Sequence, residues 1–197
     1  MESKLINCLK NNKSDYVPIW FMRQAGRYLP EFRKIREKNP NFIQLCLNER
    51  LAAEISLQPI RRFDLDAVII FSDILMVPYG LGQKVEFKKG VGPILGDLNF
   101  NVILNTKPND FVEKLSPIYK AIKRVKKEIR NKSLIGFAGA PWTLLMYMLN
   151  KQSPKNNFDI NKIIKNKSSI RNLILKLEDI IFLHAQEQIK AGVDIIQ

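Results

Sequence analysis

The sequence has little of what metal and redox sites require. It contains two cysteines, Cys8 and Cys46, and one histidine, His184. The cysteines lie far apart and have no metal-type or redox-type spacing, so we expect free thiols in a reducing compartment. His184 has no cysteine, aspartate or second histidine at ligand spacing, so we expect it to be structural and predict no metal site.

Long apolar runs are also missing. Residues 134–149 form a largely apolar, uncharged stretch, but it is shorter than the ~20 residues of a membrane-spanning helix and contains Gly136, Gly139 and Pro141. Residues 1–12 carry lysines and polar residues without a continuous apolar segment, which predicts no signal peptide. Because no Pro-, Gly- or Ser-rich linker divides the chain, we expect residues 1–197 to belong to one cytoplasmic domain without membrane contact.

Acidic residues are scarce relative to basic ones. The chain has 19 Asp and Glu against 32 Lys and Arg, for a formal net charge of +13. Such an excess indicates either an anionic partner or lysines spread over solvated helix faces. The densest cluster, residues 120–127, alternates basic with apolar positions as an amphipathic helix does, and it lacks aromatic residues that could stack on bases. We therefore expect no nucleic-acid partner.

Cofactor fingerprints are absent as well. Gly136-x-x-Gly139 follows an apolar run as a dinucleotide motif does, but the third glycine is missing and Pro141-Trp142 occupies the turn. We find no phosphate loop, no Ser/His/Asp order and no lysine-centred cofactor motif. The sequence therefore predicts no cofactor.

Short apolar runs alternate with helical patterns along the chain. Residues 67–71 and 134–138 are typical of strands buried on both faces, and residues 193–196 open a third strand. Helices are predicted at residues 49–62 (capped by Asn48), at about 110–130, from Pro141 onward, and at about 169–190 (before Gly192). Residues 76–105 are rich in Gly and Pro and predict loops or a hairpin, with 84–88 as an exposed strand.

This order of elements predicts parallel β-α units. Right-handed crossovers leave two usual outcomes, an open doubly wound sheet or a (β/α)8 barrel. Three strands fit either one. A complete barrel needs ~250 residues, so a barrel interpretation makes this chain an N-terminal portion, which would expose a sheet edge.

Arg23 and Arg27 are the first candidates for binding. Each guanidinium is permanently charged and presents a planar fork that suits a carboxylate. Gly26 between them allows a close approach of the backbone to a ligand, or a positive φ. The neighbouring residues 20–22 and 28–30 are largely apolar, so we expect the two arginines to be partly buried rather than free on the surface.

Asp73 and Tyr147 are the other candidates. Asp73 follows the strand predicted at residues 67–71, at the carboxyl edge where α/β folds place their sites. An aspartate there is also a common cap or turn residue. Tyr147 lies on an otherwise apolar helix, where a tyrosine is more often a core residue whose hydroxyl has a partner.

Three stretches carry a resemblance. Residues 22–27 read Met-Arg-Gln-Ala-Gly-Arg, residues 71–75 read Phe-Ser-Asp-Ile-Leu, and residues 136–144 read Gly-Phe-Ala-Gly-Ala-Pro-Trp-Thr-Leu. Their order and spacing resemble the uroporphyrinogen decarboxylase family. The resemblance implies a (β/α)8 TIM barrel, of which this chain holds only the N-terminal part, and a homodimer. It implies a carboxy-lyase that removes the four acetate side chains of uroporphyrinogen III as carbon dioxide, without a cofactor or metal, to give coproporphyrinogen III.

The resemblance also implies roles for individual residues. Asp73 would face the centre of the tetrapyrrole, Tyr147 would hydrogen-bond at the site, and Arg23 would be the proton-handling arginine. The substrate cleft would be lined by Arg23, Gln24, Ala25, Gly26 and Arg27, with Arg36 as a weaker candidate. Two other functions stay open: methyl transfer from corrinoid or folate carriers, and tetrapyrrole binding without catalysis.

Overall fold

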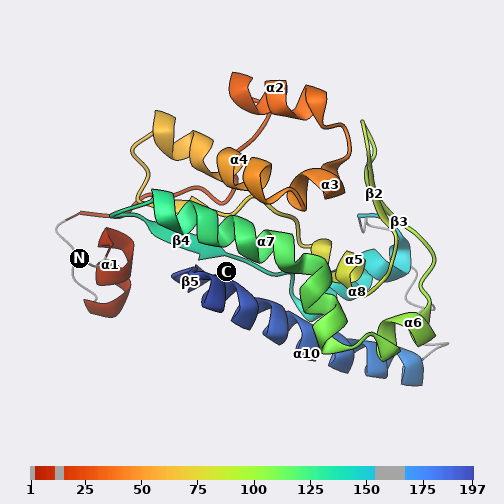
Figure 1. Ribbon diagram of the computed structural model, residues 1–197. Helices are drawn as coiled ribbons and strands as arrows, with labels where there is room; N and C mark the ends of the chain where they lie inside the picture. The colour runs from red at the N-terminus through yellow and green to blue at the C-terminus, as the bar shows by residue number, and fades with distance from the viewer. Residues whose placement is uncertain (1–2, 12–15, 154–166) are drawn as a thin grey trace.

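The centre of the protein is a parallel sheet of three strands in the order β1–β4–β5. A computed structural model describes residues 3–11, 16–153 and 167–197 (Figure 1). The strands are β1 (Ala67–Ile69), β4 (Ser133–Gly136) and β5 (Ile195–Ile196). Ala67 lies opposite Ser133 and Ile135 opposite Ile195. The three predicted strands and their parallel order are confirmed, so their carboxyl ends share one edge.

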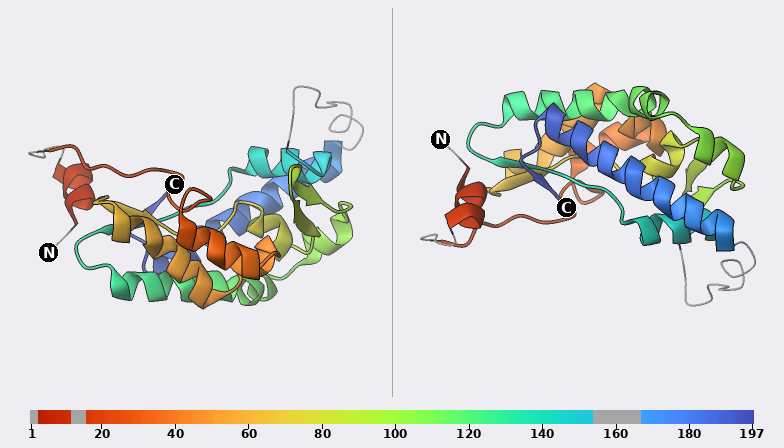
Figure 2. Two further views of the ribbon diagram at one scale, coloured as in Figure 1. Left: turned by 90° about the horizontal axis from the view of Figure 1, so that it is seen from above. Right: turned by 90° about the horizontal axis from the view of Figure 1, so that it is seen from below.

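Three long helices cover one face of this sheet (Figures 1 and 2). They are α4 (Glu49–Arg62), α7 (Pro108–Glu128) and α10 (Lys167–Ala191). Val68 and Leu134 are fully buried in the core between sheet and helices. The predicted cap of α4 is confirmed, since Asn48 Oδ1 accepts the backbone N–H groups of Arg50 and Leu51.

The other face of the sheet is packed by the N-terminal part of the chain. Leu5 of α1 (Lys4–Asn11) and Trp20 pack with Ala67 and Ile135, whose side chains alternate with those facing the helices. Figure 2 shows α1 on the opposite side of the sheet from α7. The sheet is therefore buried on both faces, as its apolar strands predicted.

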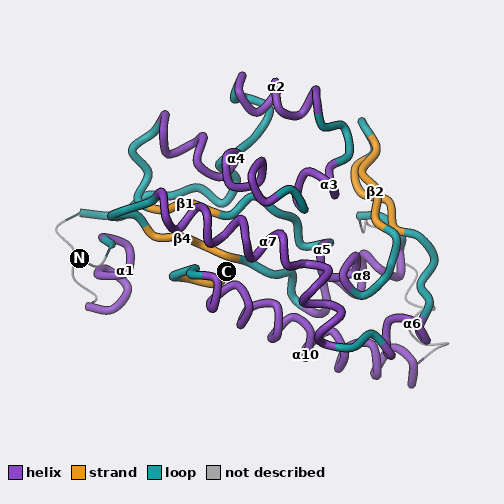
Figure 3. Tube along the Cα trace, viewed as in Figure 1, coloured by secondary structure: helices purple, strands orange, loops and turns teal. Residues whose placement is uncertain are grey.

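Shorter elements connect these layers. The short helices are α2 (Pro30–Lys38), α3 (Phe42–Cys46), α5 (Met76–Gly80), α6 (Phe100–Asn105) and α8 (Pro141–Asn150). Strands β2 (Val85–Lys88) and β3 (Gly92–Leu95) form an antiparallel hairpin separate from the central sheet (Figure 3). The predicted exposed strand and the helix start at Pro141 are thus confirmed.

Helices α5 and α6 were not predicted, because residues 76–105 were interpreted as loops. Gly80 shows why the Gly- and Pro-rich composition of residues 76–105 is misleading. A Cβ at this position would lie 2.5 Å from the Phe111 ring, so the glycine is needed for close packing of α5 on α7 and not for a turn. By contrast, Gly90 (φ +78°) and Gly92 (φ +95°) do adopt the left-handed conformation, and they shape the tip of the hairpin.

His184 is a buried structural residue, as predicted. Its Nδ1 lies 2.9 Å from Tyr119 Oη, which joins α10 to α7 by a hydrogen bond inside the core. Burial lowers the pKa of His184 to about 4, so the imidazole is neutral at neutral pH. Cys8 and Cys46 are free thiols, as expected. Among the described residues, no helix is long and apolar enough to cross a membrane.

Candidate active site

Asp73 lies just beyond the carboxyl end of β1, where the sequence placed it. Its Oδ1 accepts the backbone N–H of Leu75 at 2.9 Å, which is the turn role that an aspartate takes before a short helix. Burial raises the pKa of the Asp73 carboxyl, and the Leu75 hydrogen bond opposes that rise. No cationic side chain of the described residues pairs with this carboxylate, so its negative charge is poorly stabilised.

The loop after β4 packs directly against the loop that carries Asp73. A Cβ on Gly139 would lie 3.1 Å from Ile74 Cβ and 2.7 Å from Leu144 Cδ2. Only a residue without a side chain allows this approach. The motif at residues 71–75 and the motif at 136–144 therefore meet at the carboxyl edge of the sheet.

Gln188 of α10 holds the same loop from the helix side. Its side-chain Oε1 accepts the backbone N–H of Phe137 at 3.0 Å, and its Nε2 donates to the Phe137 carbonyl at 2.9 Å. A Cβ on Gly136 would lie 2.4 Å from that Oε1. Gly136 thus leaves room for the amide that fixes the carboxyl end of β4.

Gln24 anchors the arginine segment to the sheet. Its Nε2 donates to the Ala67 carbonyl at 2.8 Å and its Oε1 accepts the Ile69 N–H at 3.2 Å, along the edge of β1 that β4 leaves free. The side chain is 3% exposed. Because both ends of the amide bind the main chain, Gln24 positions its neighbours along the edge of β1 in this structure.

Arg23 and Arg27 are exposed, so the expectation of partial burial is wrong. The neighbouring apolar side chains do not cover them, since Phe21, Met22 and Tyr28 are themselves more than half exposed. With Gln24 turned into the sheet, the adjacent side chains turn outward. Neither guanidinium has a hydrogen-bond or ion-pair partner among the described residues.

Gly26 serves neither a positive φ nor a tight contact in this structure. Its φ lies outside the left-handed region, so that alternative is also wrong. A Cβ there would make only ordinary contact with the Tyr28 ring, at 3.5 Å. Ala25 is half-buried and packs against the apolar cluster around Leu29 and Phe32.

Arg27 and Arg36 come together in a groove of about 890 Å³ between helices α2–α3 and the β2–β3 hairpin. We call it the hairpin groove. It is lined by Arg27, Phe32, Arg33, Arg36, Glu37, Pro40, Phe42, Phe87, Lys88, Lys89, Gly90, Val91 and Gly92. Basic side chains outnumber the single acidic one, and none of the basic side chains forms an ion pair among the described residues.

The floor of the hairpin groove is aromatic and leads to Asp73. The ring centroids of Phe87 and Phe42 are 4.4 Å apart, and those of Phe42 and Phe71 are 5.6 Å apart. The Arg36 guanidinium lies 5.6 Å from the centroid of Phe42. Because Phe71 precedes Asp73 by two residues, a continuous row of rings joins the hairpin to the carboxyl edge of β1.

The charges of Arg36 and Asp73 both act on the pKa of the Cys46 thiol. Burial raises the pKa of the Cys46 thiol, the Asp73 carboxylate raises it further, and the Arg36 guanidinium opposes the rise. The thiol is therefore a neutral, unreactive group between the arginine of the groove and the carboxylate of the sheet edge.

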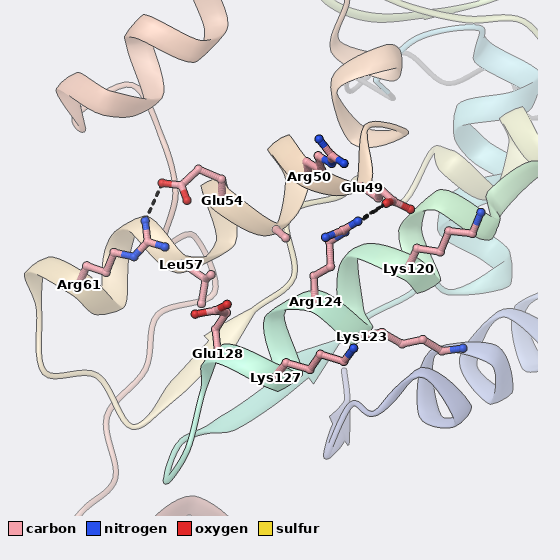
Figure 4. Close-up of a pocket in the computed structure, with 11 residues that line it drawn as sticks. Glu49, Arg50, Glu54, Leu57, Arg61, Lys120, Lys123, Arg124, Lys127 and Glu128 are labelled. Carbon is pink, nitrogen blue, oxygen red and sulfur yellow. Dashed lines mark hydrogen bonds and ion pairs between the residues drawn. The ribbon is translucent and has the colours of Figure 1, made fainter.

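A second groove, of about 630 Å³, lies between α4 and α7 on the outer helical layer (Figure 4). We call it the helix groove. It is lined by Glu49, Arg50, Ala53, Glu54, Leu57, Arg61, Lys120, Lys123, Arg124, Lys127 and Glu128. Here arginines meet carboxylates: Arg124 Nη2 lies 2.5 Å from Glu49 Oε1, and Arg61 Nη1 lies 2.6 Å from Glu54 Oε1. The lysines of residues 120–127 thus lie on a solvated helix face.

The structure brings together only some of the predicted residues. Of these residues, only Arg27 and Arg36 line the hairpin groove, and Asp73 is not among its lining residues. Tyr147 is half-buried on α8, and its hydroxyl lies 3.4 Å from Ser153 Oγ. In the part of the chain that the structure describes, no group of three His, Cys, Asp or Glu side chains is placed to hold a metal.

Sequence reasoning missed the far wall of the hairpin groove. Lys88 and Lys89 come from a hairpin, and Phe42 from α3, about 45 residues apart in the sequence. Neither stretch has a motif. The Gly90 and Gly92 pair beside two lysines was the one available signal, and it identifies a turn rather than a ligand site.

Known proteins resemble the chain over its whole length. A family model of uroporphyrinogen decarboxylase (URO-D) matches residues 1–197. A uroporphyrinogen decarboxylase of Rickettsia canadensis is 46% identical over 197 residues, covering 98% of this chain and 58% of that protein. One from Rickettsia felis is 44% identical, covering 98% and 56%. The chain therefore spans somewhat more than half the length of these relatives.

One solved structure shares the fold. A methyltransferase from Methanosarcina mazei superposes with a TM-score of 0.73 at 15% sequence identity, covering 98% of this chain and 56% of that one. At that identity, the likeness concerns the α/β fold alone. It supports the arrangement of parallel strands and covering helices described above.

Proposed function

The chain belongs to the uroporphyrinogen decarboxylase family, and on that premise we propose that the protein is a carboxy-lyase of porphyrin biosynthesis. Its substrate is uroporphyrinogen III, and its reaction releases the four acetate side chains as carbon dioxide to give coproporphyrinogen III. The observation that carries this proposal is the family match over residues 1–197. The hairpin groove supports it, because basic side chains above a row of phenylalanines suit a flat, apolar ring with carboxylate arms.

The arginines bind the carboxylate arms. Arg23 and Arg27 have guanidinium groups without a hydrogen-bond or ion-pair partner in residues 3–11, 16–153 and 167–197, and Arg36 lines the same groove as Arg27. A planar fork that binds a carboxylate through two hydrogen bonds fixes orientation as well as position. We assign Arg23 to proton handling at the ring, although a guanidinium stays protonated in proteins and must act through its charge and hydrogen bonds.

Asp73 stabilises the charge that develops during the reaction. Loss of carbon dioxide needs an electron sink, and a protonated pyrrole ring is one. Burial raises the pKa of Asp73, which means that water stabilises its charge poorly. A cationic ring that donates pyrrole N–H groups to this carboxylate supplies the missing stabilisation. Because that interaction strengthens as the ring acquires charge, it accelerates the chemical step.

Gln24 and Tyr147 take supporting roles. Gln24 holds Arg23 and Arg27 at the edge of β1 through its two main-chain hydrogen bonds. Ala25 and Gly26 continue this segment along the cleft. Tyr147 lies on the helix after β4 and hydrogen-bonds at the site in the presence of substrate, with Ser153 as its alternative partner.

The architecture of the whole protein is a (β/α)8 barrel in this proposal. The exposed Val17, Ile19 and Phe21 run beside the free edge of β1, where a barrel would place further chain. Residues 1–197 then form the N-terminal part of a single barrel domain. The family resemblance further suggests a homodimer in the cytoplasm, without metal or cofactor.

The test is an anaerobic assay of the full-length protein with uroporphyrinogen III, followed by chromatography of the oxidised products. We expect coproporphyrin together with intermediates that carry fewer acetate arms. Tetrapyrrole binding without loss of carbon dioxide would reduce the protein to a binding module. Methyl transfer from a corrinoid or folate donor instead of decarboxylation would overturn the proposal.

A further inference from the structure

The tip of the β2–β3 hairpin carries charges that the fold does not use. Lys88 and Lys89 are exposed, line the hairpin groove and have no ion-pair partner among the described residues. Lys84, which directly precedes β2, pairs with Glu86 of that strand at 2.6 Å. One lysine of the hairpin region thus has a carboxylate partner, whereas Lys88 and Lys89 at the groove have none among the described residues.

The opposite wall presents a third cation to the same space. Arg33 of α2 is exposed, and its Nη1 donates to the Arg27 carbonyl at 2.8 Å, which holds its guanidinium beside Arg27. The acidic member of the lining, Glu37, has no cationic partner among the described residues either. The entrance of the groove is thus positive on both walls.

We propose that Lys88, Lys89 and Arg33 form an entry site that captures the carboxylate arms of the tetrapyrrole before it reaches Asp73. This inference rests on the function proposed above. A lysine ammonium is a mobile point charge without a fixed fork, so Lys88 and Lys89 suit transient attraction, whereas the guanidinium forks of Arg27 and Arg36 suit docking of a carboxylate. Arg33 adds a third positive charge to the same groove. Cations that line a groove raise the rate of encounter with an anion.

A row of phenylalanines connects the entry site with Asp73. Phe87 belongs to strand β2 of the hairpin, Phe42 of α3 lies beside it in a tilted ring contact, and Phe71 continues the row toward Asp73. A tetrapyrrole held by its carboxylates at the hairpin has an apolar surface to slide along. Each decarboxylation removes one negative charge, so the product is held less firmly by the entry site than the substrate, which favours release.

The test compares two matched double variants of the full-length protein. In Lys88→Gln/Lys89→Gln, we expect KM for uroporphyrinogen III to rise about fivefold to tenfold and kcat to stay within about twofold, because two exposed charge contacts are lost. The dependence of kcat/KM on salt should become shallower. The control is Lys120→Gln/Lys123→Gln in the helix groove, which removes the same charge and should leave KM within about twofold.

Three kinetic outcomes would overturn the entry site. The first is an unchanged KM in the hairpin variant. The second is an equal rise of KM in the control variant, which would show that net charge alone matters. The third is a fall of kcat in the hairpin variant while its KM stays unchanged. Equal thermal unfolding of both variants and the parent protein confirms that neither change acts through folding.

A binding measurement separates this inference from the proposed function. Uroporphyrin, the oxidised ring with the same carboxylates, and coproporphyrin, which lacks the acetates, are titrated by fluorescence quenching. The hairpin variant should lose about fivefold to tenfold in affinity for uroporphyrin and less for coproporphyrin. If the parent protein shows no decarboxylation, the proposed function fails while this measurement still tests the groove. Equal affinities of variant and parent for uroporphyrin would refute the entry site even in an active enzyme.

Discussion

The hairpin groove and the helix groove both carry more basic than acidic side chains, but the partners of their arginines differ. In the helix groove, Arg124 and Arg61 pair with the carboxylates of Glu49 and Glu54 (Figure 4). In the hairpin groove, Arg27, Arg36 and the tip lysines have no acidic partner among the described residues. Positive charge alone therefore does not identify a binding site in this protein.

The apolar residues beneath the two grooves also differ. Ala53 and Leu57 lie beneath the ion pairs of the helix groove, where α4 packs against α7. Phe42 and Phe87 lie beneath the free cations of the hairpin groove and continue through Phe71 to the carboxyl edge of the sheet. Among the described residues, the hairpin groove differs from the helix groove in having no ion pair between its lining residues and in a row of phenylalanines that leads toward the edge where the parallel strands end, which favours it as the candidate site.

The largest expected effect comes from removing a charge that the fold does not need. Asp73→Asn should lower turnover of uroporphyrinogen III by about 1000-fold, the usual magnitude for loss of a group aimed at developing charge. Because burial raises the pKa of Asp73 in the folded protein, its ionised form at neutral pH costs stability, and this cost grows as pH rises through the folded pKa. The neutral amide can still accept the Leu75 N–H, so the variant should unfold at a temperature equal to or above that of the parent protein.

The control for this variant is Asp64→Asn at the opposite end of the sheet. Asp64 pairs with Lys132 at 2.9 Å and lies before β1. Its replacement should leave turnover unchanged. Near-normal turnover of Asp73→Asn would remove Asp73 from the mechanism, and the hairpin groove would then lose its connection to chemistry.

A second effect comes from the buried Tyr119–His184 pair between α7 and α10, which makes stability depend on pH. His184 has a folded pKa of about 4 against 6.5 when unfolded, so the unfolded chain binds more protons between these values. Stability is fully present above pH 6.5 and falls by about 3 kcal/mol as pH drops to 4. Denaturant unfolding at a series of pH values measures this loss.

The matched variant for the acid effect is Tyr119→Phe/His184→Leu. It removes both partners of the buried hydrogen bond together, so no polar group is left without a partner. Its stability should depend on pH more weakly than that of the parent protein by about the same 3 kcal/mol over this window. Identical pH profiles of the two proteins would show that His184 is not the titrating group.

The smallest effects come from exchanging one arginine in each groove. Arg27→Gln should raise KM for uroporphyrinogen III about tenfold and leave thermal unfolding unchanged, because its guanidinium has no partner among the residues that the structure describes. Arg124→Gln should do the opposite: it breaks an exposed ion pair, so unfolding shifts slightly and KM stays within about twofold. Equal changes of KM in both variants would contradict the proposal that the substrate binds in the hairpin groove and not in the helix groove.

Much of the fold could be predicted because its signals are local. The apolar run at residues 67–71, Asn48 before α4 and Pro141 at the start of α8 each act within a few residues of themselves. Parallel strand order followed from their alternation with helices. Helices α5 and α6 were missed because Gly80 is a packing glycine, and a glycine's packing role depends on Phe111, which is distant in the sequence.

The candidate site could be predicted in its parts but not in its assembly. The motifs identified Asp73 and the arginines, yet the exposure of Arg23 and Arg27 depends on where the Gln24 side chain points. Gln188 had no signal at all, since its two hydrogen bonds to Phe137 form only when α10 packs on β4. The hairpin groove likewise exists only after α2, α3 and the hairpin come together.

The amide of Gln24 also makes the placement of the arginine segment depend on the formation of the sheet. It bonds to Ala67 and Ile69 across more than 40 residues of sequence, and it fits only when β1 is extended and correctly aligned. A chain whose sheet has not yet formed lacks both of these anchors for the segment that carries Arg23 and Arg27. The order of the arginine segment therefore depends on the order of the sheet.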